Sequence, residues 1–249
     1  MRFRAPLLAV AGLVAFLLLW EAAPRFGLVN PMMLPVPSAL PKAFLREVAS
    51  GTWGASIAES LGHYLMGLGV GAALGAALGI ATGMFRPLDE ALSGIVRVFR
   101  PIPGLAWVPF AIMWFGATLQ AAVFIIATGV FWIVFFAAHG AVRGVGSELI
   151  EVAEAFGFRS SWSKLTKIIV PAAMPGLLVG LRTALGQAWM AVVAAELFGV
   201  PGLGQRMMQA SSLLATDVVV VYMLTMAALY GIIDTGFVAL QGWLLRWRA

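Results

Sequence analysis

Long apolar stretches separated by short polar breaks run through almost the whole chain. A helix that crosses a bilayer needs about 20 predominantly apolar residues, with its backbone groups satisfied internally. Six stretches meet this requirement, near residues 5–23, 56–84, 91–116, 119–140, 168–197 and 217–244. The pattern therefore predicts an all-α membrane protein, a polytopic bundle of about six transmembrane helices.

Composition supports the membrane and excludes several other classes. Of 249 residues, 61% are hydrophobic and 11% are charged, against about 25% charged in a typical soluble domain. The net charge of +5 does not indicate nucleic-acid binding, because the basic residues lie in the breaks between apolar stretches. With no cysteine and two histidines, we expect no metal site, and no cluster of polar residues indicates a catalytic one.

The positions of lysine and arginine predict the orientation, since these residues favour cytoplasmic loops. With the N-terminus inside, the inner breaks hold Arg2, Arg4, Arg86, Arg143, Arg159, Lys164, Lys167, Arg246 and Arg248, and the outer breaks hold Arg25, Lys42, Arg46 and Arg206. Both termini are therefore expected in the cytoplasm. The N-terminus resembles a secretory signal, but its apolar run is long enough to span, so we expect an uncleaved first helix.

Glycines recur every fourth residue in the second stretch. They are Gly67, Gly71, Gly75, Gly79 and Gly83, with a second small-residue row of Gly69, Ala73, Ala77 and Ala81 beside them. Such rows let helix backbones approach closely in lipid. On this feature alone, ordinary helix packing is a better explanation than a special role in transport.

The longest predicted inner loop, residues 143–167, has the pattern of two short helices. Ser147 is expected to cap the first helix and Gly157 to end it in a left-handed conformation, after which Ser160 or Ser161 caps the second. Leu149, Val152 or Ala153, and Phe156 share one face of the first helix. The pattern alone leaves two alternatives open, a helix docked on a cytoplasmic partner and a helix on the membrane surface.

Three short stretches of this region stand out together: Glu151-Val152-Ala153, then Gly157, then Ile168-Ile169-Val170-Pro171. They resemble the EAA motif of ABC importer permeases, in which this loop forms a coupling helix that seats in a cleft of the ATPase subunit. The spacing from Gly157 to Pro171 is one residue longer than the usual pattern. Val152 and Val170 are mild departures from the alanine and leucine of the motif.

Further motifs are similar to the nitrate, sulfonate, taurine and bicarbonate branch of that family. They are Leu34-Pro35-Val36-Pro37-Ser38, Arg100-Pro101-Ile102-Pro103, Trp114-Phe115-Gly116, Pro171-Ala172-Ala173-Met174-Pro175, Gly180-Leu181-Arg182 and Gly202-Leu203-Gly204. The likeness covers nearly the whole chain. It implies a type I ABC importer fold, a bacterial inner-membrane location, and ATPase-coupling residues at Glu151, Val152, Ala153, Glu154, Ala155, Gly157 and Arg159.

The resemblance also implies partners. The chain has no glycine-rich phosphate loop of the Walker type, so it is not expected to be an enzyme, and no cofactor is expected on it. ATP and magnesium would bind a cytoplasmic ATPase dimer. A second permease copy, in a homodimer, and a periplasmic or lipid-anchored substrate-binding protein complete the expected complex. Residues 1–55 would form an N-terminal helix and periplasmic segment, and 56–244 the transmembrane domain.

Charged residues inside the predicted spans are candidates for function, because they are costly in lipid. Arg182 lies roughly 16 Å into the fifth span, and Asp234 at a similar depth in the sixth. We favour a structural pair between Arg182 and Asp234, with Arg182 lining the solute path as the alternative. His63, which stands where the branch often has arginine, is a further candidate for the path, as are Gln187 and Glu196.

Two other classes of protein remain as rivals. A self-contained secondary transporter or channel would show paired membrane-embedded acids and helices broken at mid-depth. The acids are sparse here, and the polar loop has no role in that hypothesis. A membrane-embedded enzyme would show His, Asp or Glu clustered near a membrane face, and the sequence has no such cluster.

Overall fold

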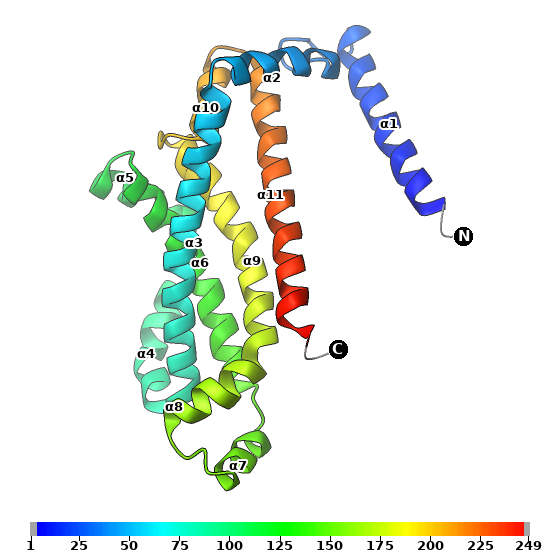
Figure 1. The fold of residues 1–249 in the computed structure, drawn as a ribbon. Helices are drawn as coiled ribbons and strands as arrows, with labels where there is room; N and C mark the ends of the chain where they lie inside the picture. Colours follow the sequence, from blue (N-terminus) through cyan, green and yellow to red (C-terminus); the bar gives the residue numbers. More distant parts are fainter. Residues whose placement is uncertain (1–3, 247–249) are drawn as a thin grey trace. The chain divides into compact units, whose positions relative to one another are not determined.

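The computed structural model describes residues 4–246, and every regular element in that range is helical (Figure 1). Arg2 and Arg248, which contributed to the predicted orientation, lie outside these residues. The elements are α1 (Arg4–Arg25), η1 (Pro37–Ala39), α2 (Leu40–Ala49), α3 (Thr52–Met84), α4 (Arg86–Phe99), η2 (Gly104–Trp107), α5 (Val108–Phe115), α6 (Leu119–Arg143), α7 (Ser147–Ala155), α8 (Ser161–Lys164), the π-helical turn η3 (Leu165–Ile169), α9 (Val170–Leu197), α10 (Leu203–Ser212) and α11 (Thr216–Leu244).

Five of the six predicted spans are single helical stretches: α1, α3, α6, α11 and the stretch Ser161–Leu197. The third predicted span, over 91–116, is not one continuous helix. Its two parts, Arg86–Phe99 and Gly104–Phe115, meet at an angle of 78°. Pro101 and Pro103 explain the break, because proline has no amide hydrogen to continue the helical ladder, and Pro103 itself is extended (φ −65°, ψ 143°). The described chain thus has five spanning helices, or six if the bent pair counts as one.

The chain packs as two compact units. The first contains Met1–Glu59 and Pro201–Ala228, and the second contains Ser60–Val200 and Leu229–Ala249. These units group residues by packing, and the predicted division of the chain into 1–55 and 56–244 stays a prediction.

A buried ion pair organises the first unit. The carboxylate of Glu47 on α2 accepts hydrogen bonds from Arg206 Nε (3.0 Å) and Nη2 (2.9 Å) on α10. The Tyr222 hydroxyl of α11 donates to the same carboxylate at 2.9 Å. These bonds hold the pKa of Glu47 below its ordinary value, with the Arg206 hydrogen bonds as the largest cause. One carboxylate of α2 therefore binds α10 and α11, whose contacting residues lie 159 and 175 positions later in the sequence.

The glycine row of α3 packs against α6 in the second unit. A Cβ atom at Gly71 would lie 2.6 Å from the carbonyl oxygen of Ala127, and one at Gly75 would lie 2.6 Å from that of Phe131. Both distances are far inside van der Waals contact, so only glycine permits this approach. The second row differs, since Gly69 has no atom within 4 Å of such a Cβ. Within the described residues the first row packs against α6, whereas Gly69, Ala73 and Ala77 of the second row are exposed.

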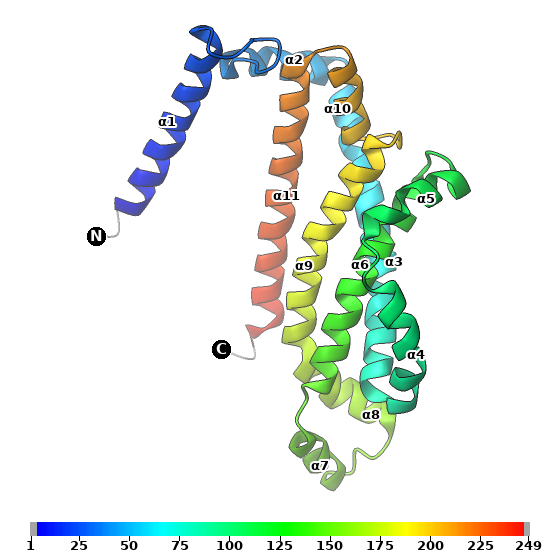
Figure 2. The same cartoon turned by 180° about the vertical axis from the view of Figure 1, so that it is seen from behind.

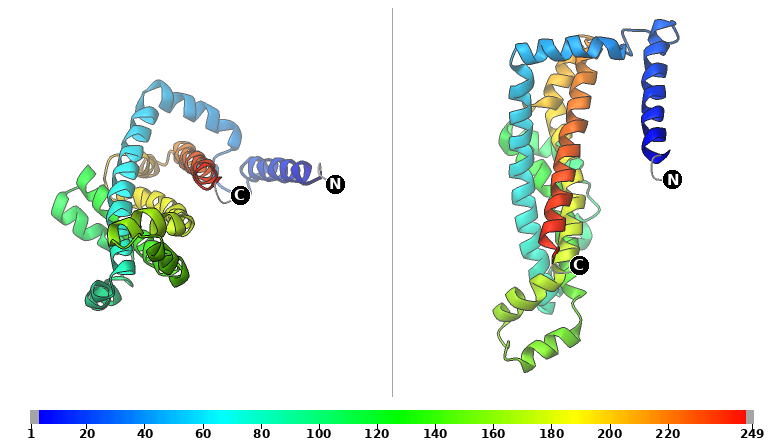
Figure 3. Two further views of the ribbon diagram at one scale, coloured as in Figure 1. Left: turned by 60° about the horizontal axis from the view of Figure 1, so that its bottom comes forward. Right: turned by 45° about the vertical axis from the view of Figure 1, so that its right-hand side comes forward.

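Helices α6 and α9 lie side by side in the second unit (Figures 1 and 2). At one end, Val142 of α6, Ile169 of η3 and Ala173 of α9 form a buried apolar cluster. The segment with α7 and α8 connects these ends and projects beyond them (Figure 3). This arrangement places the two-helix loop at the tip of the α6–α9 pair.

Candidate coupling loop and membrane-embedded polar groups

The first helix of the loop, α7, begins one residue earlier than predicted. Gly146 occupies the N-cap with extended geometry (φ −59°, ψ 139°), and the N-cap makes no side-chain hydrogen bond. Ser147 is therefore the first helical residue, and the expectation that it caps the helix is wrong. Glycine is itself an acceptable N-cap, which is why the helix starts without the serine hydroxyl.

The end of α7 confirms the prediction for Gly157. Its φ is +92°, in the left-handed region. The Gly157 amide donates to the Glu154 carbonyl, and the Phe158 amide donates to the Ala153 carbonyl, both at 3.0 Å. This pair of bonds is a Schellman motif, which satisfies the last carbonyls of the helix. The chain is thereby turned sharply toward α8.

Polar contacts hold the two short helices together. Lys164 of α8 forms an ion pair with Glu154 of α7, and its hydrogen bond lowers the pKa of the Glu154 carboxyl. Ser160 caps α8, as its hydroxyl oxygen accepts from the Ser163 amide at 3.1 Å. The Lys167 ammonium lies 4.9 Å from the centre of the Phe158 ring. The loop is a defined structure and not a loose linker.

The predicted apolar face of α7 is open. Leu149, Val152 and Phe156 are exposed by 53%, 54% and 79%, whereas Ala153 is buried. The remaining predicted coupling residues, Glu151, Glu154, Ala155, Gly157 and Arg159, are also exposed. Three large apolar side chains at helical spacing on a projecting loop are typical of a docking surface.

Arg182 and Asp234 meet within the second unit. The Arg182 Nε and Nη2 atoms donate to the two Asp234 oxygens, each at 2.9 Å. With Val179, Thr183, Tyr230 and Gln241 they line a pocket between α9 and α11. The Arg182 side chain is 49% exposed, so it can also face a solute, and the path hypothesis stays open for this residue.

His63 and Glu196 meet in a second polar cluster, buried between α3 and α9. Glu196 Oε1 accepts from the Ser60 hydroxyl at 2.7 Å and lies 3.1 Å from His63 Nδ1. All three side chains are buried. Gln187 belongs to neither cluster and lies beside Gly129 of α6. The four predicted path residues are therefore distributed over three places.

Sequence reasoning missed two polar groups. One is the Glu47 network of the first unit. The other lies on α4, where Asp89, Ser93, Arg97 and Arg100 share one face. Their spacing of four, four and three residues was a signal for this shared face.

An all-helical membrane bundle that projects a rigid two-helix loop has the architecture of a membrane component that works with a partner. The family model described as "Binding-protein-dependent transport system inner membrane component" matches residues 69–249. The chain belongs to this family. It is a membrane permease component of an ABC importer, not an enzyme, and such a component works with an ATPase and a substrate-binding protein.

Individual proteins agree with this assignment. The chain is 34% identical over 245 residues to SsuC of Escherichia coli K12, which is named as an aliphatic sulfonates transport permease protein; the match covers 98% of this chain and 92% of SsuC. It is 30% identical over 247 residues to the taurine permease TauC of the same organism, covering 97% and 90%. The methionine ABC transporter MetNI has the same fold, with a TM-score of 0.67, 22% identity and coverage of 80% and 98%.

Proposed function

We propose that this chain is the membrane subunit of an ATP-driven importer that moves a small anionic solute into the cytoplasm by alternating access. The open apolar face of α7, formed by Leu149, Val152 and Phe156, is the observation that carries the proposal. Such a face would be unfavourable in water, and burial in a groove of the ATPase would remove it from solvent. The EAA-like motif lies on the same helix.

The contacts of the loop support the proposal that it transmits motion from the ATPase to the spanning helices. The Glu154–Lys164 pair and the Schellman turn at Gly157 hold α7 and α8 as one body. The cluster of Val142, Ile169 and Ala173 joins that body to α6 and α9. A displacement of the loop by the ATPase would therefore move two spanning helices together, as in shear and rigid-body transitions.

The rest of the complex follows from this role. Two copies of the chain would pair, each with one subunit of an ATPase dimer that holds ATP and magnesium. A periplasmic or lipid-anchored binding protein would deliver the solute, and both termini would lie in the cytoplasm. Relatives named for aliphatic sulfonates and taurine support a sulfonate-type solute for this chain.

Co-purification with the ATPase and binding protein encoded beside it tests the proposal. Val152→Asp places a charge on the docking face, and Glu151→Ala and Gly157→Pro alter the motif and its turn. Ser161→Asp is the matched control, because it adds a charge to the same loop at a helix start that favours anions. We expect the three test variants to stay folded in nanodiscs and to lose the ATPase. Wild type and Ser161→Asp should retain it and support solute-stimulated ATP hydrolysis.

The secondary-transporter hypothesis makes the opposite prediction. The bend between α4 and α5 is a broken helix of the kind that hypothesis expects. If the wild-type chain alone moves solute into liposomes and binds no ATPase, the importer proposal is wrong.

A further inference from the structure

Helix α4 lines one wall of an open pocket with polar residues and with the half-buried Leu92 and Val96. Asp89, Ser93 and Arg97 line a pocket inside the second unit. On the opposite side Ile95 and Val98 are 56% and 65% exposed. In a bilayer the exposed Ile95 and Val98 would meet hydrocarbon, and charged residues of spanning segments usually face the bundle interior or a water-filled cavity.

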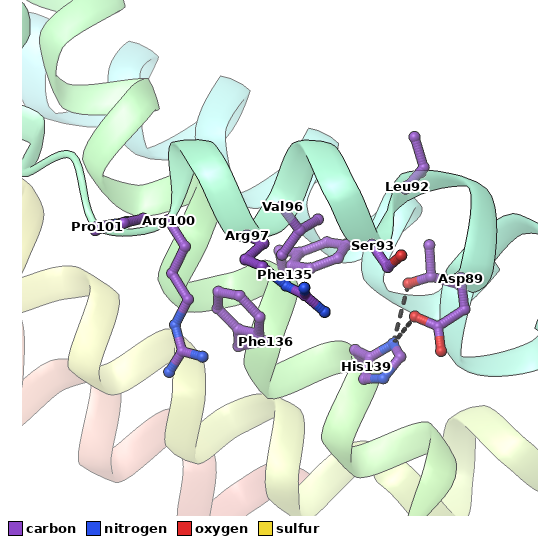
Figure 4. A pocket seen from close by; sticks show the side chains of 11 residues that line it. Asp89, Leu92, Ser93, Val96, Arg97, Arg100, Pro101, Phe135, Phe136 and His139 are labelled. Atoms are coloured by element: carbon purple, nitrogen blue, oxygen red, sulfur yellow. Dashed lines mark hydrogen bonds and ion pairs between the residues drawn. The ribbon is translucent and has the colours of Figure 1, made fainter.

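The pocket has a volume of about 490 Å³ and lies between α4, α6 and the end of α3 (Figure 4). Asp89 and His139 lie at one end, Arg100 and Phe136 at the other, and Arg97 between them. Charged groups thus alternate with aromatic rings along its length.

The acidic end of the pocket is already neutralised. Asp89 forms an ion pair with Arg143 at 3.2 Å and lies 3.8 Å from His139 Nδ1. The same His139 nitrogen is 3.1 Å from the Thr82 hydroxyl. No cation beyond Arg143 is needed to offset the Asp89 charge.

Two positive charges therefore remain in the pocket. Among residues 4–246, neither Arg97 nor Arg100 has an acidic partner. The Arg100 guanidinium carbon lies 4.6 Å from the centre of the Phe136 ring, which leaves the edges of the guanidinium available as hydrogen-bond donors. Two such guanidinium groups suit the oxygens of an anionic head group.

We propose that this pocket binds an organic oxyanion, with Arg97 and Arg100 on its head group and a short apolar tail against Phe135 and Phe136. A pocket with a few charged groups among apolar walls is suited to an amphiphilic small molecule more than to a fully hydrated inorganic anion. The inference rests on the proposed function and names the chemical class of the solute and a site on its path.

The position of the pocket links it to the coupling loop. Arg143 is the last residue of α6, and α7 begins at Ser147. The Asp89–Arg143 pair therefore joins the pocket wall to the helix end from which the loop departs. In the proposed orientation this is the cytoplasmic end, so the pocket would hold the solute late in its passage.

Uptake by the complete importer tests the site. The permease, its ATPase and its binding protein would be reconstituted in phosphatidylcholine vesicles, with radiolabelled butanesulfonate as the probe. We expect Arg97→Gln with Arg100→Gln to reduce uptake on the order of tenfold, equivalent to one lost charge-assisted contact. The double lysine variant should retain part of the uptake, since the charge remains. Arg86→Gln, on the same helix but outside the pocket, should match wild type.

Two more measurements distinguish loss of the solute site from a folding defect and from loss of a bound lipid head group. All variants should co-purify with the ATPase and show the wild-type melting temperature. If the double glutamine variant takes up butanesulfonate as well as wild type does, the proposed site is wrong. If native mass spectra show that the double glutamine variant has lost bound phosphatidylglycerol while its uptake is unchanged, the two arginines bind a lipid head group. That result also overturns the proposed site.

The pocket and the proposed function can fail separately. If the ATPase co-purifies with wild type but butanesulfonate is not imported, the sulfonate assignment of the pocket is wrong and the importer stands. If no ATPase binds, the proposed function itself is wrong.

Discussion

Arg182 of α9 and Asp234 of α11 are joined by two parallel hydrogen bonds of 2.9 Å each. This bidentate geometry fixes both side chains and brings together two spans that are separated by α10 in the sequence. Opposite charges in contact within spanning helices satisfy each other where water is scarce.

The pair predicts a specific pattern of rescue. Arg182→Gln or Asp234→Asn alone leaves one charge without its partner at membrane depth, so each should lower the melting temperature in nanodiscs. The double variant removes both charges and should melt closer to wild type. Thr183→Val, at the neighbouring position of α9, serves as a control. If Asp234→Asn melts like wild type while Arg182→Gln abolishes uptake, Arg182 acts on the solute path instead.

The hydrogen bonds of Glu47 with Arg206 and Tyr222 predict that the stability of the first unit falls in acid. The folded pKa of Glu47 lies below the ordinary value of 4.5, so the stabilisation is complete above that pH and is lost as the pH falls through the folded pKa. At neutral pH, Glu47→Gln should cost about 1–3 kcal/mol. The melting temperatures of wild type and Glu47→Gln should converge in acid. Equal pH slopes for the two proteins would contradict this, and Glu90→Gln is an exposed control.

The packing of α3 predicts different outcomes for two glycines that are two positions apart. Gly71→Ala would force a methyl group to within 2.6 Å of the Ala127 carbonyl, so α3 and α6 must separate, at a cost of about 1–3 kcal/mol. Gly69→Ala meets no atom within 4 Å and should change stability by less than about 0.5 kcal/mol. Thermal melting in one lipid measures both. Equal losses would show that the row is not packed against α6.

The π-helical turn η3 predicts that one residue can be removed there. A π turn contains one residue more than the α-helical turn it replaces, and the spacing from Gly157 to Pro171 is one residue longer than in the EAA pattern. Deletion of Thr166, which is exposed in η3, should give a continuous α-helix that folds and binds the ATPase. Deletion of the buried Ala173 should unfold the chain. If both deletions are equally harmful, η3 does not hold the extra residue.

Part of the functional region was predictable because its signals are local. Glycine favours the left-handed position that ends a helix, so Gly157 by itself indicates a helix end. The shared face of Leu149, Val152 and Phe156 follows from the helical repeat alone. Ser147 failed as a cap because Gly146 occupies the N-cap instead. Serine ranks above glycine at an N-cap, so local propensity pointed to the wrong residue.

The spans and the loop follow from the sequence itself, since bilayer thickness sets the length of an apolar stretch and proline and glycine act on their own backbone. Only the tertiary structure decided which polar groups meet. The contacts of Glu47 with Arg206, His63 with Glu196, and Asp89 with Arg143 join residues 159, 133 and 54 positions apart. Such pairings depend on which helix faces pack together, and apolar periodicity in lipid does not specify those faces.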